Sequence, residues 1–278
     1  MTTMKDWRPF PGPQTDFLAC TAFETLFGWM PGGGKTDGLL VDALRYVGQG
    51  HGGHYRALLL RRTFPELRFG LIQRSLDLYP RIGGEYHEAR KTWRFPGGET
   101  VEFVFLEKEE DVLRYQGSTY AFVGFDELAA FTERQYLAMV ARCRSKYDVR
   151  CRVRATSNRV ELDEKDPHWV IKRWGPWLDP ADPRFLFPGD KFTPEEAEGA
   201  SRRFIWATLF DNPNLLGQIH YMATIREMAK IDPAGTKRLI GAPEKFMSGA
   251  IELLTPQAAK LVEEFMRLLE GRRDPERS

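Results

Sequence analysis

Short apolar runs alternate along the chain with segments whose apolar residues recur at helical spacing. The runs have the length of strands and are bounded by glycine, proline or charged residues. Because a strand–helix–strand rhythm is typical of parallel sheets, we predict an α/β fold with a mostly parallel central sheet flanked by helices. The strands are expected at 21–28, 55–62, 120–128 and 148–158, and the helices at 36–47, 64–82 and 132–144.

Two regions depart from this rhythm. Residues 89–107 predict a hairpin, because Pro-Gly-Gly separates two alternating runs. Beyond residue 158 proline, aspartate and glycine become frequent, which favours long irregular connections. A further strand at 202–210 and a helix follow, and an amphipathic helix with a charged tail ends the sequence. We expect a core at 1–200, a small lid or linker subdomain at 201–255, and a C-terminal helix and tail at 256–278.

The composition is that of an ordinary globular protein. The 278 residues are 42% hydrophobic and 28% charged, and the formal net charge is +1, so a polyanionic partner would need a local basic patch. The three cysteines lack metal-ligand spacing, and their odd number argues against a disulfide framework. The five histidines show no metal-ligand spacing either. With no apolar run long enough for a membrane span and no signal region, we expect a soluble protein in a reducing, intracellular setting.

A glycine-rich stretch separates the first predicted strand from the first predicted helix. Its end, Gly34, Lys35 and Thr36, fits the second half of the phosphate-binding loop G-x-x-x-x-G-K-[ST]. Successive backbone N–H groups in such a loop bind anionic oxygens, and the following helix adds its positive end. Gly32 and Gly33 let the backbone approach the phosphates. Lys35 would reach the β and γ phosphates, and Thr36 would place its hydroxyl on Mg²⁺.

One position of this loop departs from the pattern. Trp29 stands where the motif has its first glycine, and Gly28 lies one place early. The alternative interpretation is a glycine-rich turn with a chance lysine. In a functional loop, Trp29 would crowd the loop or stack near the nucleotide.

A second motif supports the first. The apolar run ending in Asp126 and Glu127 places two carboxylates at the carboxyl edge of the predicted sheet, where ligands of such folds bind. Beside phosphates this pair would be repulsive unless a metal ion lay between them, so we expect Asp126 to help hold Mg²⁺. Glu127 is then free to orient the attacking water. Taken alone, such a pair is more often a solvated strand end.

The next predicted strand ends in Thr156, Ser157 and Asn158. Small polar groups at this edge could sense the γ phosphate and transmit its loss. A capped turn that leads into a loop is an equally good interpretation of the same residues.

Five segments together resemble the ATPase domain of the large terminase subunits of tailed bacteriophages. They are PGPQTDFLACTAFETLFGWMPGGGKTDGLLVDAL, LLLRRTFPEL, YQGSTYAFVGFDELAAFTERQYLAMVARCR, RVRATSN and FIWATLFDNPNL, and they follow the family's order over most of residues 11 to 240. The resemblance implies a P-loop NTPase fold and an ATP-driven motor that packages double-stranded DNA through a portal. It further implies subunits in a homo-oligomeric ring, a portal protein and a small terminase subunit as partners, and the host cytoplasm as location.

The resemblance also assigns roles to residues. Gln14 would read the adenine edge, and Arg114 would be the arginine that acts on a neighbouring subunit, with Arg142 and Arg144 as competitors. TLFDNPNL would belong to the lid. The remaining roles are nucleotide binding by Gly32, Gly33, Gly34, Lys35, Thr36 and Asp37, metal binding by Thr36 and Asp126, catalysis by Lys35 and Glu127, and coupling by Thr156, Ser157 and Asn158.

Two further features differ from the family. Arg159 follows Thr-Ser-Asn where proline is common, and a charged stretch replaces the glycines expected next. Terminase large subunits normally continue into a ribonuclease-H-like nuclease domain. Few residues follow the expected lid, so we expect no nuclease domain in this sequence.

Several arginines are candidates for contact with DNA phosphates. Arg150, Arg152 and Arg154 alternate along one predicted strand and therefore share a face, and Arg61 and Arg62 close another. The alternative for the triplet is the solvated face of an edge strand. A tryptophan cluster, Trp169, Trp174 and Trp177, favours packing beneath long loops over base stacking.

Two other functions remain open from the sequence. A helicase-like ATPase would share the acidic pair, but it needs a second ATPase lobe for which the sequence is too short. A nucleotide-binding assembly protein would result if Trp29 disabled the loop.

Overall fold

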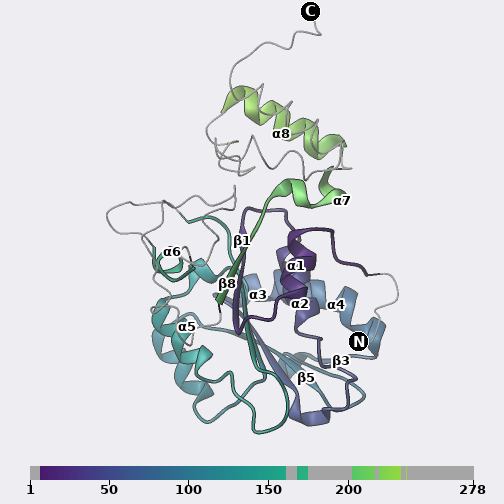
Figure 1. Cartoon of the computed structure of the whole chain (residues 1–278), viewed down its shortest axis with the longest axis vertical. Helices are drawn as coiled ribbons and strands as arrows, with labels where there is room; N and C mark the ends of the chain where they lie inside the picture. Colours follow the sequence, from purple (N-terminus) through teal and green to yellow (C-terminus); the bar gives the residue numbers. More distant parts are fainter. Residues whose placement is uncertain (1–6, 161–167, 175–201, 217–218, 233–235, 237–278) are drawn as a thin grey trace, which may run out of the picture.

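The computed structural model describes residues 7–160, 168–174, 202–216, 219–232 and 236. Their central feature is an eight-stranded sheet in the order β3-β4-β5-β2-β6-β7-β1-β8 (Figure 1). Every neighbouring pair from β5 to β8 is parallel, and β3–β4 and β4–β5 are antiparallel. The strands are β1 (Glu24–Trp29), β2 (Arg56–Arg61), β3 (Glu85–His87), β4 (Thr92–Arg94), β5 (Thr100–Phe105), β6 (Phe122–Phe125), β7 (Arg152–Thr156) and β8 (Arg202–Ala207). The predicted α/β fold with a mostly parallel sheet is confirmed.

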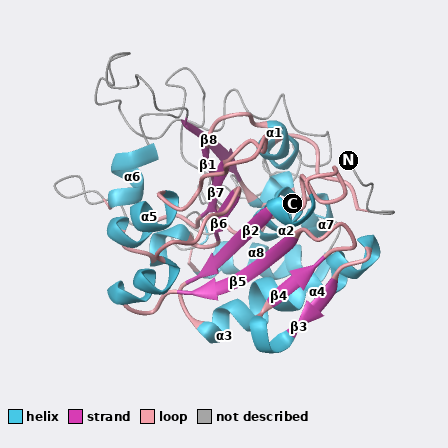
Figure 2. Cartoon of the chain, turned by 90° about the horizontal axis from the view of Figure 1, so that it is seen from below, coloured by secondary structure: helices cyan, strands magenta, loops and turns pink. Residues whose placement is uncertain are grey.

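Helices cover both faces of this sheet (Figure 2). One face carries α1 (Pro13–Ala19), α2 (Lys35–Asp42), α3 (Phe64–Leu67) and α4 (Gln73–Leu78), and the other carries α5 (Glu133–Val140) and α6 (Trp169–Trp174). Short 3-10 turns lie at 52–54, 79–82, 88–90, 109–115, 128–130 and 209–211. Because successive strand residues point to opposite faces, the strands feed two separate cores. Phe27 and Leu59 belong to the core under α1 and α2, and their neighbours Leu26 and Leu58 belong to the core under α5.

The segment predicted as one helix over 64–82 is broken into several pieces. It starts at a capping box in which Thr63 accepts from Glu66 N and Glu66 accepts from Thr63 N. A π-helical stretch, η2 (Arg68–Ile72), separates α3 from α4. The other predicted helices are shorter than expected, and the sequence pattern missed α1 and β3. The hairpin at 89–107 is confirmed as β4 and β5.

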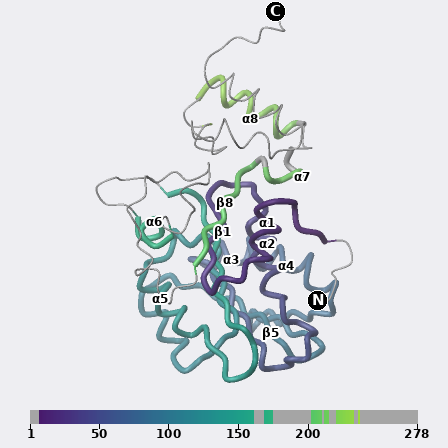
Figure 3. The backbone as a smooth tube through the Cα atoms, viewed as in Figure 1, coloured from purple at the N-terminus to yellow at the C-terminus, as the bar shows by residue number. Residues whose placement is uncertain are grey.

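Beyond β8 the chain continues into α7 (Pro213–Leu216) and α8 (Ile219–Ile231), which lie past the carboxyl end of β8 (Figure 3). This stretch is the described part of the expected lid. The rest of the expected lid, and the expected terminal helix at 256–278, lie outside the described residues. Within the described residues, no helix is both long and apolar enough to cross a membrane.

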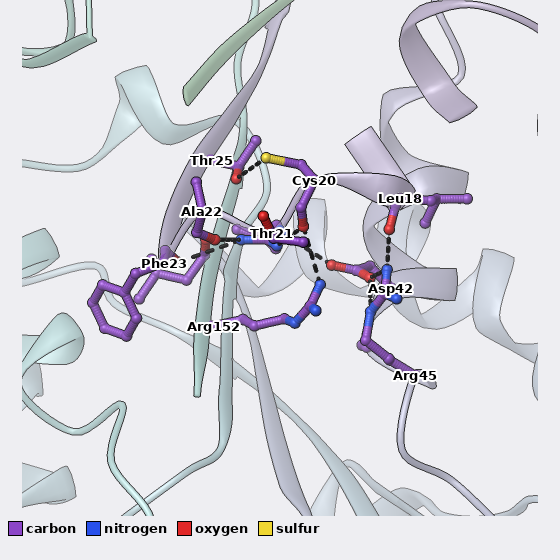
Figure 4. A network of polar contacts seen from close by, with 12 residues as sticks. Leu18, Cys20, Thr21, Ala22, Phe23, Thr25, Asp42, Arg45 and Arg152 are labelled. Carbon is purple, nitrogen blue, oxygen red and sulfur yellow. Dashed lines mark hydrogen bonds and ion pairs between the residues drawn. The ribbon is translucent and has the colours of Figure 1, made fainter. Parts of the chain in front are cut away.

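For Arg152 and Arg154 of the arginine triplet, both interpretations, contact with DNA and the solvated face of an edge strand, are wrong. The strand β7 is internal, between β6 and β1, so it is not an edge strand. Arg154 is 0% exposed, and its Nε donates to Asp42 Oδ2 at 2.9 Å. Arg152 is also buried and donates to Cys20 O at 3.2 Å (Figure 4). Arg150 precedes the strand and is exposed, so neither a solvated face nor a DNA grip describes the two buried arginines.

These buried arginines hold the ends of several elements together. Arg154 donates to the carbonyls of Cys20, Ala22 and Phe23, which join α1 to β1. Asp42, at the end of α2, also accepts from Arg45 Nε at 2.7 Å. The network therefore ties α1, the start of β1, the end of α2 and β7 together. A buried charge needs such partners, because an unpaired one would be costly.

Candidate nucleotide-binding site

The carboxyl ends of β1, β6 and β7 bring the candidate residues to one edge of the sheet. In the register, Phe27 lies beside Thr156, and Phe125 lies beside Ala155. The glycine-rich loop after β1, the acidic pair after β6 and the polar triplet after β7 are therefore neighbours. Ligands of open α/β sheets bind at this edge.

The glycine-rich loop needs glycine at three positions, either for a positive φ or for lack of space for a side chain. Gly34 has a φ of +71°, and a Cβ there would lie 2.6 Å from Gln14 Nε2. Gly32 also has a positive φ, 85°. A Cβ on Gly33 would lie 3.0 Å from the Ala207 Cβ of β8. The loop is thus wedged between α1 and β8, and α2 begins directly after it at Lys35.

Gln14 on α1 lies directly behind this loop. It is buried, its Oε1 accepts from Phe10 N at 2.7 Å, and its Nε2 donates to Gly34 O at 2.7 Å. Because both ends of the amide have backbone partners, Gln14 fixes the loop against the N-terminal segment. Its expected contact with the adenine edge stays a prediction.

The ammonium group of Lys35 lies inside the site. The side chain is 7% exposed, and Nζ donates to Met30 O and, at 2.8 Å, to Asn158 Oδ1. Burial lowers the pKa of Lys35 to about 8, and the nearby charges of Glu127 and Asp126 partly oppose this shift. At neutral pH the group is still mostly protonated, which suits a ligand with several negative charges.

Asp126 follows β6 and is almost fully buried, with 1% exposure. Its Oδ1 accepts from Thr156 Oγ1 at 2.5 Å, and its Oδ2 accepts from Arg61 Nε at 2.8 Å. The carboxylate is thus held from β7 on one side and from β2 on the other. The sequence did not indicate the contact with Arg61, which was considered only as a candidate DNA contact.

Glu127 occupies an unusual backbone conformation, with a φ of 57°. Its N–H donates to Thr156 Oγ1 at 3.3 Å, and its carboxylate accepts from Asn158 N at 3.1 Å and from Asn158 Nδ2 at 2.7 Å. Burial, followed by the charge of Asp126, raises the pKa of Glu127 above its usual value. A carboxyl group with a raised pKa is better suited to accept a proton from water.

Asn158 connects the two motifs that the sequence paired. Its side-chain oxygen accepts from Lys35, and its side-chain nitrogen donates to Glu127. The glycine-rich loop and the acidic pair therefore converge through one residue. The middle residue of the polar triplet, Ser157, is buried. Its hydroxyl donates to Asn158 O at 2.9 Å, which helps to shape the turn.

The residues at this edge fit a magnesium ion. Mg²⁺ prefers oxygen ligands and usually keeps several waters while it binds one or two protein groups and substrate phosphates. Asp126 supplies a buried carboxylate, and Thr36, the second residue of α2, follows Lys35 directly and carries a hydroxyl group. Within the described residues, no group of three or more His, Cys, Asp or Glu side chains could hold a metal without a ligand's help.

Asp37 and the described tryptophans lie in other surroundings. The Asp37 carboxylate accepts two hydrogen bonds from Arg74 of α4, both at 2.7 Å, so its side chain ties α2 to α4. The Trp29 side chain is buried in the core, edge-on to Phe204 of β8 at 5.4 Å. It therefore does not stack near a nucleotide. Trp169 and Trp174 pack with Tyr136, as the packing interpretation predicted, and Trp177 lies outside the described residues.

Arg114 lies away from these residues, on a 3-10 turn, η5 (Glu109–Tyr115). Its side chain is 64% exposed and pairs with Asp111 at 2.8 Å. The role of Arg114 at a neighbouring subunit stays a prediction. The sequence pattern placed Asn212 in the lid but gave no sign of its contact, in which Nδ2 donates to Gly32 O at 2.6 Å.

The fold and this edge of the sheet define an α/β architecture in which a glycine-rich loop and an acidic pair meet at the carboxyl edge of a parallel sheet. No protein-family model matches the sequence, and no curated protein matches it either. The solved structures similar to this chain include ATPase domains of phage large terminases. The Thermus phage P74-26 large terminase ATPase domain matches with a TM-score of 0.57 and 14% identity, covering 86% of this chain and 94% of that chain.

A second similar structure has a longer chain. The large terminase of the thermophilic bacteriophage D6E in complex with ADP matches with a TM-score of 0.54 and 17% identity, covering 84% of this chain and 53% of that one. The match thus spans about half the length of the D6E protein. At these identities the similarity establishes the fold, which is that of a terminase ATPase domain.

Proposed function

We propose that this chain is a Mg²⁺-dependent ATPase of a phage large terminase, whose work is the translocation of double-stranded DNA into a procapsid. The observation that carries the proposal is the bridge formed by Asn158 between Lys35 and Glu127 on a terminase-type fold. A structural glycine turn would have no need for a buried lysine beside one buried and one half-buried carboxylate. The similar D6E structure in complex with ADP supports a nucleotide as the ligand.

In this mechanism each residue has a separate task. The backbone N–H groups from Gly32 to Gly34 and the start of α2 bind the phosphates, and Lys35 balances their charge. Thr36 and Asp126 would hold Mg²⁺, which supplies positive charge for the leaving phosphate. Glu127 orients water and accepts its proton, and its raised pKa suits that task.

Thr156 and Asn158 connect this chemistry to the rest of the molecule. Thr156 contacts Asp126 and Glu127, and Asn158 contacts Lys35 and Glu127. A bound γ phosphate would draw the Lys35 ammonium away from Asn158. After the γ phosphate departs, Lys35 would donate to Asn158 again, which restores the bridge to Glu127. We therefore propose that the end of β7 transmits the loss of the γ phosphate to the parts of the chain that contact DNA.

Measured ATP turnover tests this function. We expect the native chain to hydrolyse ATP and Glu127→Gln to reduce turnover by roughly 10²- to 10⁴-fold, the range of a general base, while it still binds ATP. Stimulation of the native rate by double-stranded DNA or by a small terminase subunit would support packaging. ATP binding without turnover in both chains would instead favour the nucleotide-binding assembly protein.

We further propose that Arg114 acts on the site of a neighbouring subunit in a ring. The isolated chain is then expected to turn over slowly, with a rate per subunit that rises with protein concentration. Mixing Arg114→Ala with Glu127→Gln is expected to restore part of the activity, because some sites then combine an intact Glu127 with an intact arginine. If Arg142→Ala or Arg144→Ala gives this complementation and Arg114→Ala does not, Arg114 is the wrong residue.

A further inference from the structure

Arg61 is placed beside Asp126 by the pairing of β2 and β6. Asp126 N donates to Leu60 O at 2.9 Å, which fixes the first residue after β6 against the last residues of β2. The side chain of Arg61 then reaches across, and its Nε lies 2.8 Å from Asp126 Oδ2. Asp126 is 1% exposed and Arg61 is 18% exposed, so the pair lies at the inner wall of the site.

Both oxygens of the Asp126 carboxylate already have partners. Thr156 donates to Oδ1 at 2.5 Å, and Arg61 donates to Oδ2. A metal ion that binds Asp126 directly must therefore share an oxygen with the Thr156 hydroxyl or the Arg61 guanidinium, or displace one of them, and at either oxygen it meets the positive charge of Arg61. Two positive charges on one carboxylate repel each other strongly in a partly buried site.

The four charged groups at this edge balance one another. Lys35 and Arg61 are cations, and Asp126 and Glu127 are carboxylates. Burial is the main cause of the lowered pKa of Lys35, and the charge of Arg61 adds to it. The positive charge of Arg61 is therefore felt across the site, as well as at Asp126.

We propose that Arg61 is the counter-ion of Asp126 in the nucleotide-free protein. Arg61 then occupies the oxygen of Asp126 that a metal would bind, and a metal-bound nucleotide displaces it on entering the site. The proposal rests on the proposed function for the nucleotide, but the pairing of Arg61 with Asp126 is a property of the protein alone. Arg61 is thus a positioning residue, which keeps a metal from binding before the nucleotide does.

Arg62 provides a matched control in the same short segment. It has the same charge and follows Arg61 directly, but it points to other partners, the carbonyl of Leu106 and Gln135 Oε1, the latter at 2.9 Å. Loss of Arg62 removes a buried arginine contact without touching Asp126. Effects common to both variants therefore report on folding, and effects confined to Arg61 report on the site.

The test measures Mn²⁺ binding to the nucleotide-free full chain by electron paramagnetic resonance. We expect weak binding to the native chain and to Arg62→Gln, and binding roughly tenfold tighter for Arg61→Gln, because a competing positive charge is gone. Adding Asp126→Asn to Arg61→Gln is expected to abolish the gain. If Arg61→Gln does not fold, as judged by its melting curve, Arg61→Met keeps the apolar stem and takes its place.

Two results would overturn the proposal. The first is an unchanged Mn²⁺ affinity after loss of Arg61, and the second is a gain that persists in the Asp126→Asn background. ATP turnover measured on the same samples distinguishes failure of the proposed ATPase function from failure of the proposed role of Arg61. A native chain without turnover contradicts the proposed function. The Mn²⁺ affinities of the native chain and of Arg61→Gln still test the role of Arg61, because they are measured without nucleotide.

Discussion

Asn158 donates two hydrogen bonds to Glu127, one from its backbone N–H and one from its side chain, and both carboxylate oxygens of Glu127 are used. The same asparagine accepts from Lys35 at 2.8 Å. In this arrangement the proposed catalytic base is engaged by protein donors. Each oxygen keeps a second lone pair with which it can accept a hydrogen bond from a water molecule.

The first prediction concerns this pair. Asn158→Asp places a carboxylate beside Glu127, which raises the pKa of Glu127 further because like charges disfavour the ionised form. Activity that depends on the ionised base is lost as the pH falls through this pKa. The acid limb of the kcat–pH profile is expected to move to higher pH than in the native chain.

Asn158→Ser is the neutral control for that experiment. It removes the side-chain donor to Glu127 without adding charge, so the acid limb is expected to move to higher pH only modestly, and by less than in Asn158→Asp. An acid limb that moves equally in both variants would mean that lost hydrogen bonds, and not the added charge, cause the shift.

The second prediction follows from the lowered pKa of Lys35, about 8. Below that pH the free site carries the protonated lysine, and above it the ammonium is lost. Affinity for ADP is therefore expected to fall by up to about tenfold per pH unit above pH 8, until the lysine of the bound state titrates as well. Calorimetric titration between pH 6.5 and 9.5 measures this trend.

Lys35→Met separates the lysine from other groups that titrate in this range. Its affinity for ADP is expected to be weak and nearly independent of pH. A native affinity that stays constant up to pH 9.5 contradicts the role of the Lys35 ammonium in binding.

The third prediction uses two glycines of similar conformation. Gly34 and Gly50 have φ values of +71° and +83°, but only at Gly34 would a Cβ collide, at 2.6 Å from Gln14 Nε2. Each alanine substitution is expected to cost roughly 1–2 kcal/mol of stability from the left-handed backbone. Only Gly34→Ala is expected to weaken ADP binding, by tenfold or more.

Both variants are compared by thermal melting and by fluorescence anisotropy with a labelled ADP. Equal losses of affinity in the two variants would contradict a specific role for the glycine-rich loop.

The fourth prediction concerns Arg154, whose guanidinium is fully buried against Asp42. Arg154→Met leaves Asp42 and several backbone carbonyls with fewer donors, and we expect a loss of about 3 to 5 kcal/mol in the free energy of unfolding. Arg150→Met removes an exposed arginine with one bond to Thr21 O, and the expected change is within about 0.5 kcal/mol. Urea denaturation of both variants measures the difference.

A loss for Arg154→Met no larger than that for Arg150→Met would contradict the structural role of the buried network. Reduced DNA binding by a fully stable Arg154→Met would return this residue to the DNA-contact interpretation.

The order and type of most elements followed from the hydrophobic pattern. Strands buried on both faces appear as apolar runs, and their glycine and proline boundaries are local signals. The lengths of helices followed less well, because the π-helical stretch at Arg68–Ile72 and the early ends of α2 and α5 depend on packing. The short edge strand β3 carries no pattern of its own.

The sequence by itself determined that a glycine-rich loop with Lys35 and an acidic pair at Asp126 and Glu127 would each follow a strand. Local chemistry is sufficient for that, since glycine conformations and strand ends are encoded within a few residues. Tertiary structure alone decided that Arg61 faces Asp126, that Arg154 is buried against Asp42, and that Asn158 joins the two motifs. These contacts depend on which strands are adjacent and in what register, and that order arises only when the whole sheet assembles.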